Sequence, residues 1–401
     1  MRLPVYLDHN ATTPLDRRVL EAMMPYLTTE FGNAASGSHS YGWKAEDAVE
    51  TAREQVARLI GASRREIVWT SGATESNNLA LKGAAQMYAE KGDHLLTCAT
   101  EHRAVLDPCR RLQDAGRKLT VLGVDAFGRV DPQEIADALT DRTILISIMA
   151  ANNEIGTLQP LAEIGRLAKE HGVLFHCDAT QAVGRVGLDV EALGIDLLSL
   201  SSHKVYGPKG AGCLYVRRRS PRVRLTCQID GGGHERGLRS GTVNVPGVVG
   251  LGAAAAICRD ELADEAPRLT TLRDRLEAGI TAGLEAVTRH GHPTERLPNT
   301  LNLSFAYVEG EALMMKLNTL AVSSGSACTS ASRQPSHVLK ALGVGEELIN
   351  SALRFSVGRD TTQEEIDFAI GEVRRGVDEL RELSPLYELA REQRAGGPAG
   401  G

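Results

Sequence analysis

The stretch IDLLSLSSHKVYGPKG, residues 195–210, decides the fold because it joins a strand pattern directly to a polar turn. Its first seven residues form an apolar run without regular alternation. This is typical of a strand buried on both faces in a mostly parallel sheet that helices cover. In such sheets ligands bind beyond the carboxyl ends of the strands. Lys204 comes three residues after Ser201, so we expect its side chain at a ligand site.

The same pattern extends over residues 46–216, where helical and strand patterns alternate. Helices are expected where apolar residues recur three and four positions apart, and strands where short β-rich apolar runs occur. This alternation predicts an α/β fold with a mostly parallel sheet. Helices are expected at 46–61, 76–92, 103–115, 132–139 and 160–172, and strands at 66–70, 94–99, 118–124, 143–149, 173–179, 195–201 and 211–216.

The chain of 401 residues is too long for one compact core, so we expect two domains. Beyond residue 258 strands become sparser, and a long charged helix is expected over 260–287, with a possible break near Pro267. This region predicts a smaller α+β domain. We therefore expect a large domain over 15–258, a small domain over 1–14 and 259–388, and a Gly/Pro/Ala-rich disordered tail over 389–401.

Charge and cysteine content exclude several classes of protein. The net charge of −6 gives no basic footprint for direct nucleic-acid binding, and no apolar run approaches the ~20 residues of a membrane span. With no signal peptide in the sequence, the expected location is cytoplasmic. The seven cysteines form no CxxC pair, so neither a disulfide framework nor an all-cysteine metal site is expected. Six of them have apolar or helical neighbours, so we expect them to be buried like small hydrophobic residues. Cys328, in SGSACTSAS (324–332), lacks such neighbours.

The residues that follow the predicted strands supply the candidate chemistry. The turn SGATESNN (71–78) opens a helix, where backbone N–H groups can hold an anion, although an ordinary helix start fits equally well. Asp178 follows an apolar strand, and its carboxylate needs a partner because burying it alone is costly. His102 alone is more often a packed or surface residue, and Lys204 alone is more often a surface residue in a turn.

Taken together, these residues indicate pyridoxal 5′-phosphate (PLP). This cofactor needs a lysine for a Schiff base, a carboxylate for its ring nitrogen, an anion cradle for its phosphate and an aromatic side chain for its ring face. Lys204, Asp178 and His102 follow three different strands and meet these needs. Further hydrogen bonds are expected to the phosphate from Ser201, His203 and Thr74, and to the ring oxygen from Gln181 and Asn153.

The sequence also resembles a known family over residues 5 to 388, nearly its full length. It is similar to the cysteine desulfurases of the class V aminotransferase group, of the iron–sulfur-assembly and nitrogen-fixation type. The resemblance implies the PLP-dependent transferase fold of type I. The motifs that carry it are YLDHNATTP (6–14), WTSGATESNN (69–78), TEHRAVLDPC (100–109), CDATQAVG (177–184), SSHKVYGPKGAG (201–212), GGGHERGLRSGT (231–242), SSGSACTSAS (323–332) and ALRFSVGR (352–359).

The resemblance implies a role for each matching residue. Lys204 would form the Schiff base, Asp178 would pair with the ring nitrogen, and His102 would stack on the ring and carry protons. Arg354 would bind the substrate carboxylate, as a bidentate guanidinium can, and Cys328 would be the nucleophile. The phosphate contacts would be Ala73, Thr74, Ser201 and His203, with Thr242 from the other subunit of a homodimer, and the ring contacts would be Asn153 and Gln181.

The implied reaction explains the sequence around Cys328. L-Cysteine would be converted to L-alanine while Cys328 takes the sulfur as a persulfide and passes it to an acceptor such as an iron–sulfur scaffold or a tRNA-thiolation protein. A thiol that must move between substrate and acceptor needs a loop with little packing, and glycine, serine and alanine favour one. The thiolate is the reactive form of a cysteine.

Two alternatives stay open at this point. One is a different PLP enzyme of the same fold, either a selenocysteine lyase or a transaminase, and the transaminase would not need Cys328. The other, from a different class, is a scaffold or sensor whose cysteines hold a metal or cluster, which the wide spacing of the cysteines argues against.

Overall fold

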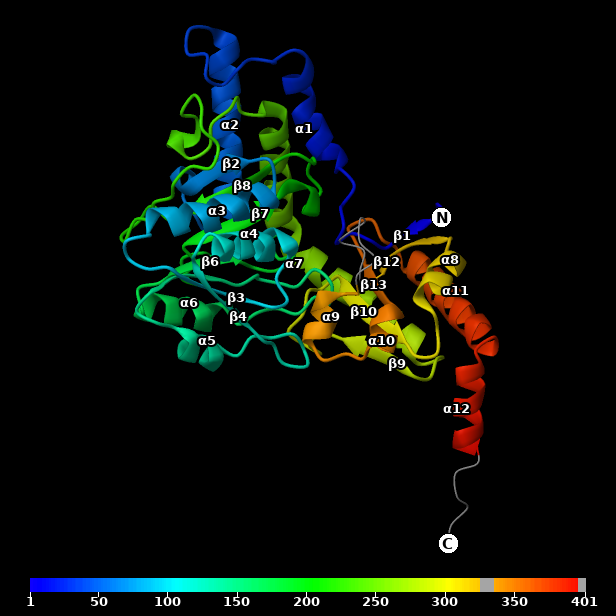
Figure 1. The fold of residues 1–401 in the computed structure, drawn as a ribbon. Coiled ribbons are helices and arrows are strands. Elements are labelled where there is room, and N and C mark those ends of the chain that lie inside the picture. The colour runs from blue at the N-terminus through cyan, green and yellow to red at the C-terminus, as the bar shows by residue number, and fades with distance from the viewer. Residues whose placement is uncertain (325–334, 396–401) are drawn as a thin grey trace. The chain divides into compact units, whose positions relative to one another are not determined.

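The computed structural model describes residues 1–324 and 335–395 and divides the chain into two compact units (Figure 1). The larger unit comprises residues 12–153 and 157–264. The smaller unit comprises residues 1–11 and 154–156 and the chain from 265 onward. The sequence analysis placed the corresponding boundaries after residues 14 and 258 and did not anticipate the short segment 154–156.

The larger unit is built on a seven-stranded sheet with the strand order β2-β8-β7-β6-β5-β3-β4. The strands from β7 to β4 are parallel, whereas β8 runs antiparallel to both of its neighbours. The prediction of a mostly parallel sheet is therefore confirmed. The strands are β2 (Ile67–Thr70), β3 (His94–Cys98), β4 (Lys118–Leu122), β5 (Thr143–Ser147), β6 (Leu174–Asp178), β7 (Leu197–Ser201) and β8 (Gly212–Val216).

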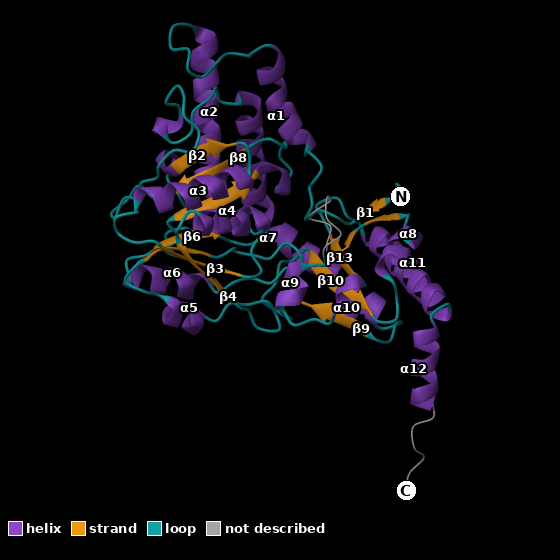
Figure 2. Cartoon of the chain, viewed as in Figure 1, coloured by secondary structure: helices purple, strands orange, loops and turns teal. Residues whose placement is uncertain are grey.

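Helices flank this sheet, as Figure 2 shows. The predicted helices are all present, with ends that differ by a few residues, and two of them, α4 and α5, begin at the predicted residue behind a side-chain cap. Asp131, for example, caps a helix that has Pro132 in its first turn, a favoured arrangement. The helices are α1 (Arg17–Thr28), α2 (Ser40–Leu59), α3 (Ala73–Met87), α4 (Arg103–Asp114), α5 (Pro132–Ala138) and α6 (Leu161–Glu170), with 3₁₀ turns η1 (Arg64–Glu66), η2 (Ser202–Lys204) and η3 (Glu235–Gly237).

The long helix α7 (Val245–Thr281) corrects the sequence analysis in two respects. It begins well before residue 260, and it continues through Pro267 without a break. Its first turns are rich in glycine, which lowers helix propensity, but packing requires small residues there. A Cβ at Gly252 would lie 2.5 Å from the Cα of Ala52, and a Cβ at Gly250 would lie 2.6 Å from the Sδ of Met23.

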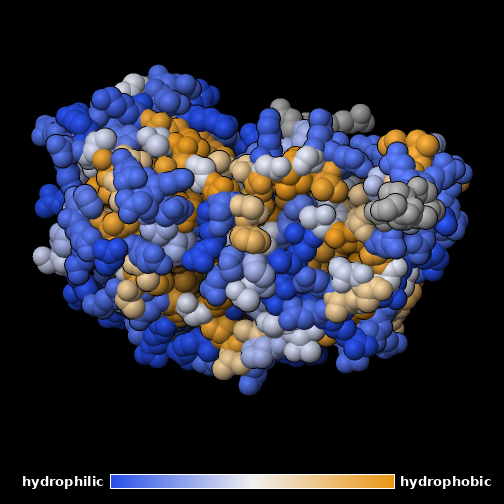
Figure 3. Space-filling model, turned by 90° about the horizontal axis from the view of Figure 1, so that it is seen from below, coloured by the Kyte–Doolittle hydropathy of each residue, from blue (hydrophilic) through white to orange (hydrophobic). Residues whose placement is uncertain are grey.

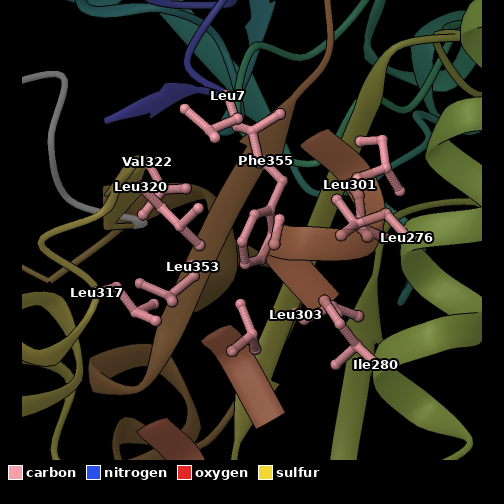
Figure 4. Close-up of a cluster of buried hydrophobic side chains, with 14 of the residues drawn as sticks. Leu7, Leu276, Ile280, Leu301, Leu303, Leu317, Leu320, Val322, Leu353 and Phe355 are labelled. Atoms are coloured by element: carbon pink, nitrogen blue, oxygen red, sulfur yellow. The ribbon is translucent and has the colours of Figure 1, made fainter. Parts of the chain in front are cut away.

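The smaller unit contains a four-stranded antiparallel sheet, ordered β12-β13-β10-β9, and a separate parallel pair of β1 and β11. Phe355 of β13 lies among leucine side chains of its core (Figure 4). The strands are β1 (Val5–Tyr6), β9 (Val287–His290), β10 (Thr300–Phe305), β11 (Leu320–Ala321), β12 (Ser323–Ser324) and β13 (Ala352–Ser356). The helices are α8 (Gly310–Lys316), α9 (His337–Ala341), α10 (Glu346–Asn350), α11 (Gln363–Glu382) and α12 (Pro385–Ala395).

Helix α12 corrects the expectation of a disordered tail from residue 389. Residues 389–395 belong to this helix, and 396–401 lie outside the described residues. The segment 385–395 is rich in good helix formers. The helix is also held at its start, where the ring of Tyr387 contacts the ring of Tyr307 and lies 5.3 Å from the guanidinium of Arg381.

Neither the face in Figure 3 nor the helices indicate a membrane-crossing segment in the described part of the chain. The face in Figure 3 mixes hydrophilic and hydrophobic residues. Among the helices of residues 1–324 and 335–395, none combines the length and the apolar character that a bilayer crossing requires.

Candidate active site

Four predicted site residues follow strands that are neighbours in the sheet. His102, Asn153, Asp178 and Lys204 come after or at the end of β3, β5, β6 and β7, which are parallel to one another. Their carboxyl ends therefore meet at one edge of the sheet, where ligands bind in folds of this kind. Strand β2 runs in the same direction as β7, because both are antiparallel to β8. Helix α3, which follows β2, thus begins at this edge.

The start of α3 has the features expected of an anion cradle. Gly72 precedes the helix with φ 151°, and it has no side chain to cap Ala73 and Thr74. The positive φ favours glycine at position 72, and close packing against this turn requires glycine at position 212, where a Cβ would lie 2.5 Å from the Cα of Gly72. Ser201 flanks the turn, its Oγ 3.5 Å from where a Cβ on Gly72 would stand. Unfilled backbone donors at a helix start favour an anion such as phosphate.

An ion pair stabilises the first turn of this helix. The Nε of Arg239 lies 2.9 Å from the Oε1 of Glu75, and the backbone N–H of Ser71 donates to Oε2 of the same carboxylate at 2.8 Å. Thr242, three residues after Arg239, is exposed in this chain.

The turn that carries Lys204 is held by the segment that follows the N-terminal strand. The carbonyl of His203 accepts from the backbone N–H of Thr13 at 2.9 Å and from its hydroxyl at 3.0 Å. The backbone N–H of Tyr206, a residue with φ 65°, donates to the same hydroxyl at 2.8 Å. A non-glycine residue in this region of φ is uncommon and persists where surrounding contacts hold it. Thr13 therefore fixes the backbone on both sides of Lys204.

His203 is neutral near pH 7. Burial, followed by the nearby Lys204 and Lys209, lowers its pKa to about 4. Its Nδ1 lies 3.1 Å from the Oγ1 of Thr12. Toward an anion in the cradle it thus offers a hydrogen bond rather than a full charge.

His102 has a defined ring orientation. It caps α4, and its Nδ1 accepts from the backbone N–H of Ala104 at 3.0 Å. Burial lowers its pKa, so the neutral ring carries its proton on Nε2.

The residue before it, Glu101, is fully buried and accepts from the backbone N–H of Met149 at 2.5 Å. Burial raises the pKa of this carboxyl to about 8. Glu101 thus ties the turn after β3 to the turn after β5, on which Asn153 lies, buried.

Asp178 is buried at the end of β6 and accepts three hydrogen bonds. The Nδ2 of Asn77 donates to Oδ2 at 2.7 Å. The backbone N–H and the hydroxyl of Thr180 donate to Oδ1 at 3.0 and 2.5 Å. These donors fix the orientation of the carboxylate, and a carboxylate is the group that pairs with the ring nitrogen of PLP. Gln181, the predicted ring contact, follows Thr180 and is half-buried.

This donor set fits PLP. The uncapped start of α3 and the neutral His203 suit a phosphate, the clamped carboxylate of Asp178 suits the ring nitrogen, and the neutral imidazole of His102 suits a ring face. Ser201, His203 and Gln181 also lie at or after the ends of β6 and β7, at this edge of the sheet. Thr242 lies in a loop and is exposed.

Arg354 belongs to the smaller unit, in the middle of β13, and is buried. Its Nη2 lies 2.7 Å from the Oδ1 of Asp8 and donates to the hydroxyl of Ser323 at 3.2 Å.

In the same unit Glu154 accepts from the hydroxyl of Ser336 at 2.5 Å, and burial raises the pKa of Glu154 to about 7. Cys328 lies outside the described residues.

Four supporting residues were not predicted: Asn77, Thr180 and Glu101 in the larger unit, and Asp8, the partner of Arg354, in the smaller unit. Two of them have a local signal. Asn77 lies one helical turn after Ala73, and Thr180 lies two residues after Asp178, the spacing at which an aspartate accepts from the following backbone. Met149, which donates to Glu101, and Arg354, which pairs with Asp8, are distant in sequence and give no such signal.

The other cysteines mostly match expectation. Five are buried, and Cys227 is the exception, because it lies half-buried in a polar loop with its Sγ 3.3 Å from a carboxylate oxygen of Asp230. Within residues 1–324 and 335–395 no group of three or more His, Cys, Asp or Glu side chains could hold a metal ion. The buried cysteines are Cys98, Cys109, Cys177, Cys213 and Cys258.

Comparison with known proteins identifies the family. The family model Aminotransferase class-V matches residues 5–368. The cysteine desulfurase IscS of Anaeromyxobacter sp. (strain Fw109-5) is 60% identical over 392 residues, which cover 98% of this chain and 97% of that protein. A solved NifS-like protein superposes with a TM-score of 0.87 at 38% identity, over 94% of this chain and 100% of that one. SspA, solved in complex with cysteine, superposes with a TM-score of 0.78 at 39% identity, over 88% of this chain and 98% of that one. This chain therefore belongs to the class-V aminotransferase family.

Proposed function

We propose that this chain is a PLP-dependent cysteine desulfurase that converts L-cysteine to L-alanine and delivers the sulfur to acceptor proteins. The observation that carries the proposal is the combination of Lys204, the clamped carboxylate of Asp178 and the uncapped start of α3 at one edge of the sheet. The 60% identity to a cysteine desulfurase over 98% of the chain supports the choice of substrate.

Each predicted residue has a task in this proposal. Lys204 holds the cofactor covalently, Asp178 pairs with the ring nitrogen and His102 lies against the ring. When bound, PLP supplies the electron-accepting ring that allows bonds at the Cα of an amino acid to break. The phosphate is held by Ala73, Thr74, Ser201 and His203, together with Thr242 of a second copy. The ring oxygen is bound by Asn153 and Gln181.

The chain's own side chains then carry the reaction. Arg354 binds the α-carboxylate of L-cysteine, since a guanidinium offers two parallel donors. Lys204, as a free amine, takes the proton from Cα. The thiolate of Cys328 attacks the Sγ of the substrate, the Cβ–Sγ bond breaks, and the sulfur remains on Cys328 as a persulfide. The bonding electron pair stays with the carbon fragment, which becomes L-alanine on protonation, and His102, with its proton on Nε2, is the proposed proton carrier.

A turnover assay tests this function. The purified protein is incubated with PLP, L-cysteine and a thiol reductant, and sulfide and alanine are measured together. The proposal requires the two products in equal amounts, together with a violet-absorbing cofactor that borohydride fixes on Lys204. Pyruvate or keto-acid formation without sulfide would favour a transaminase. Turnover of L-selenocysteine with none of L-cysteine would favour a selenocysteine lyase, and a colourless protein that binds iron would favour a cluster scaffold.

The acceptor is proposed to be a protein thiol, such as that of an iron–sulfur scaffold or a tRNA-thiolation protein. The persulfide sulfur moves to the acceptor thiolate by exchange chemistry. Free thiols persist in a reducing compartment, which supports a cytoplasmic location. The net charge of −6 supports protein partners rather than nucleic acid.

We also propose a homodimer. Helix α1 exposes Leu20, Met24 and Leu27 at the helical spacing of one face, which is the kind of apolar stripe that a partner chain covers. The exposed position of Thr242 leaves it available to a second copy. Sedimentation of the native chain at micromolar concentration tests this, and a monomer at all concentrations would contradict it.

A further inference from the structure

We propose that Asn77 is a positioning residue for the cofactor, which fixes the carboxylate of Asp178 relative to the anion cradle. This inference rests on the proposed function, because it concerns the group that Asp178 would bind. The two residues are 101 positions apart in the sequence, and both are buried.

The orientation of the Asn77 amide follows from the chemistry of its partner. An ionised carboxylate can only accept hydrogen bonds, so the atom of Asn77 that lies 2.7 Å from the Oδ2 of Asp178 must be the nitrogen. The Oδ1 of Asn77 is then buried, and it has no hydrogen-bond partner in the described part of the chain. Burying an unsatisfied carbonyl costs free energy. The arrangement therefore does not optimise stability, and unsatisfied polar groups of this kind are typical of functional sites.

The position of Asn77 on α3 connects Asp178 to the helix whose start would hold the phosphate. Asn77 lies four residues after Ala73, so both lie on the same face of the helix, one turn apart. The backbone N–H groups at the start of α3 face the anion, and Asn77 faces the carboxylate. One rigid helix thus sets the distance between the phosphate site and the site for the ring nitrogen.

Thr180 completes the arrangement from the other side. Its backbone N–H and hydroxyl both bind Oδ1 of Asp178, so that among residues 1–324 and 335–395 Asn77 alone links Oδ2 to another element of the sheet edge. Without Asn77 the carboxylate would still be held locally by its own turn but would lose its connection to α3. We therefore expect weaker cofactor binding rather than unfolding when Asn77 is replaced.

The test compares Asn77→Ala and Asn77→Asp with Asn78→Ala, a matched control. Asn78 is the next residue of the same helix, is half-buried rather than buried, and donates to the backbone carbonyl of Thr74 instead of to Asp178. The dissociation constant of PLP is measured by titrating the apo-protein, and the melting temperature of each apo-protein is measured in parallel. We expect at least a tenfold rise in the dissociation constant for Asn77→Ala. A larger rise is expected for Asn77→Asp, which places a second carboxylate beside Asp178. The control should stay within twofold.

The outcomes separate this inference from the function on which it rests. If the native chain does not bind PLP, the proposed function fails. If the native chain binds PLP and both Asn77 variants bind it within twofold of native, only this inference is overturned. If Asn77→Ala lowers the apo-protein's melting temperature markedly, Asn77→Ser is judged by the same two criteria. A fall in melting temperature in either variant without a change in PLP affinity would assign Asn77 to stability and overturn the inference.

Discussion

The guanidinium of Arg354 lies 2.7 Å from the carboxylate of Asp8, 346 residues earlier in the chain. Arg354 is held in β13 between β10 and β12, and its side chain is 3% exposed, whereas that of Asp8 is 18% exposed. The protein thus keeps a buried arginine in contact with a carboxylate at the position where the family resemblance predicts recognition of the substrate carboxylate. The negative charge of Asp8 stabilises the positive charge of this buried arginine.

Replacement of Arg354 by lysine tests this role. Lysine keeps the charge but loses the planar pair of donors that binds a carboxylate. We expect the KM for L-cysteine to rise about tenfold or more, since uniform binding is lost. The affinity for PLP should not change, because the cofactor residues lie in the larger unit. Arg359→Lys is a suitable control, because Arg359 is paired with Glu265 in the same unit. An unchanged KM in Arg354→Lys would exclude this arginine from substrate binding.

Lys204 is distinguished from a surface lysine by comparison with Lys209. Both residues lie in the turn after β7, and Lys209 is exposed. We expect Lys204→Ala to lower the rate of alanine formation at least about a hundredfold, as loss of a general base does. It should also abolish labelling by borohydride. Lys209→Ala should retain both. If borohydride still linked the cofactor to Lys204→Ala, another lysine would hold it.

Glu101 gives a prediction about the pH dependence of stability. Burial raises its pKa from 4.5 to about 8 in the folded chain. Between these values the folded state holds a proton that the unfolded state has lost, so the contribution of Glu101 to stability falls as pH rises. The slope is at most about 1.4 kcal/mol per pH unit. Below pH 4.5 both states are protonated, and the contribution is fully present.

Glu101→Gln tests this linkage because glutamine resembles the neutral acid and does not titrate. We expect the melting temperature of the variant, relative to the native apo-protein, to be higher at pH 8 than at pH 5.5. Glu134, an exposed glutamate in the first turn of α5, provides the control substitution Glu134→Gln. A difference between the Glu101 variant and native protein that stays constant with pH would show that Glu101 is ionised throughout.

The sheet of the larger unit was predictable because its strands are short apolar runs bounded by turn residues. Asp178, His102 and Lys204 could be placed at one edge because parallel strands end together. The beginning of α7 could not be predicted, since Gly250 and Gly252 argue against a helix until their close packing against Met23 and Ala52 is known. At the start of α7, tertiary packing outweighs the low helix propensity of glycine.

The supporting residues of the site were harder to find than the residues they hold. Asn77 and Asp178 meet across 101 residues, and Asp8 and Arg354 across 346. Such contacts depend on how the sheet is assembled, which one sequence does not reveal. The helix at 385–395 was not predicted for a different reason. The Gly/Pro-rich residues after it suggested disorder, and the sequence does not reveal that the ring of Tyr387 contacts the guanidinium of Arg381.

The most direct test of the central claim is a single turnover of the native enzyme with one equivalent of L-cysteine and no reductant, followed by mass analysis of the cysteine-containing peptides. The account predicts that the peptide carrying Cys328 gains the mass of one sulfur atom as one equivalent of alanine appears. In Cys328→Ser neither change should occur, although PLP remains bound. Cys227→Ser, which removes the half-buried thiol, should behave as the native enzyme does. Formation of alanine and sulfide by Cys328→Ser at the native rate would contradict the account.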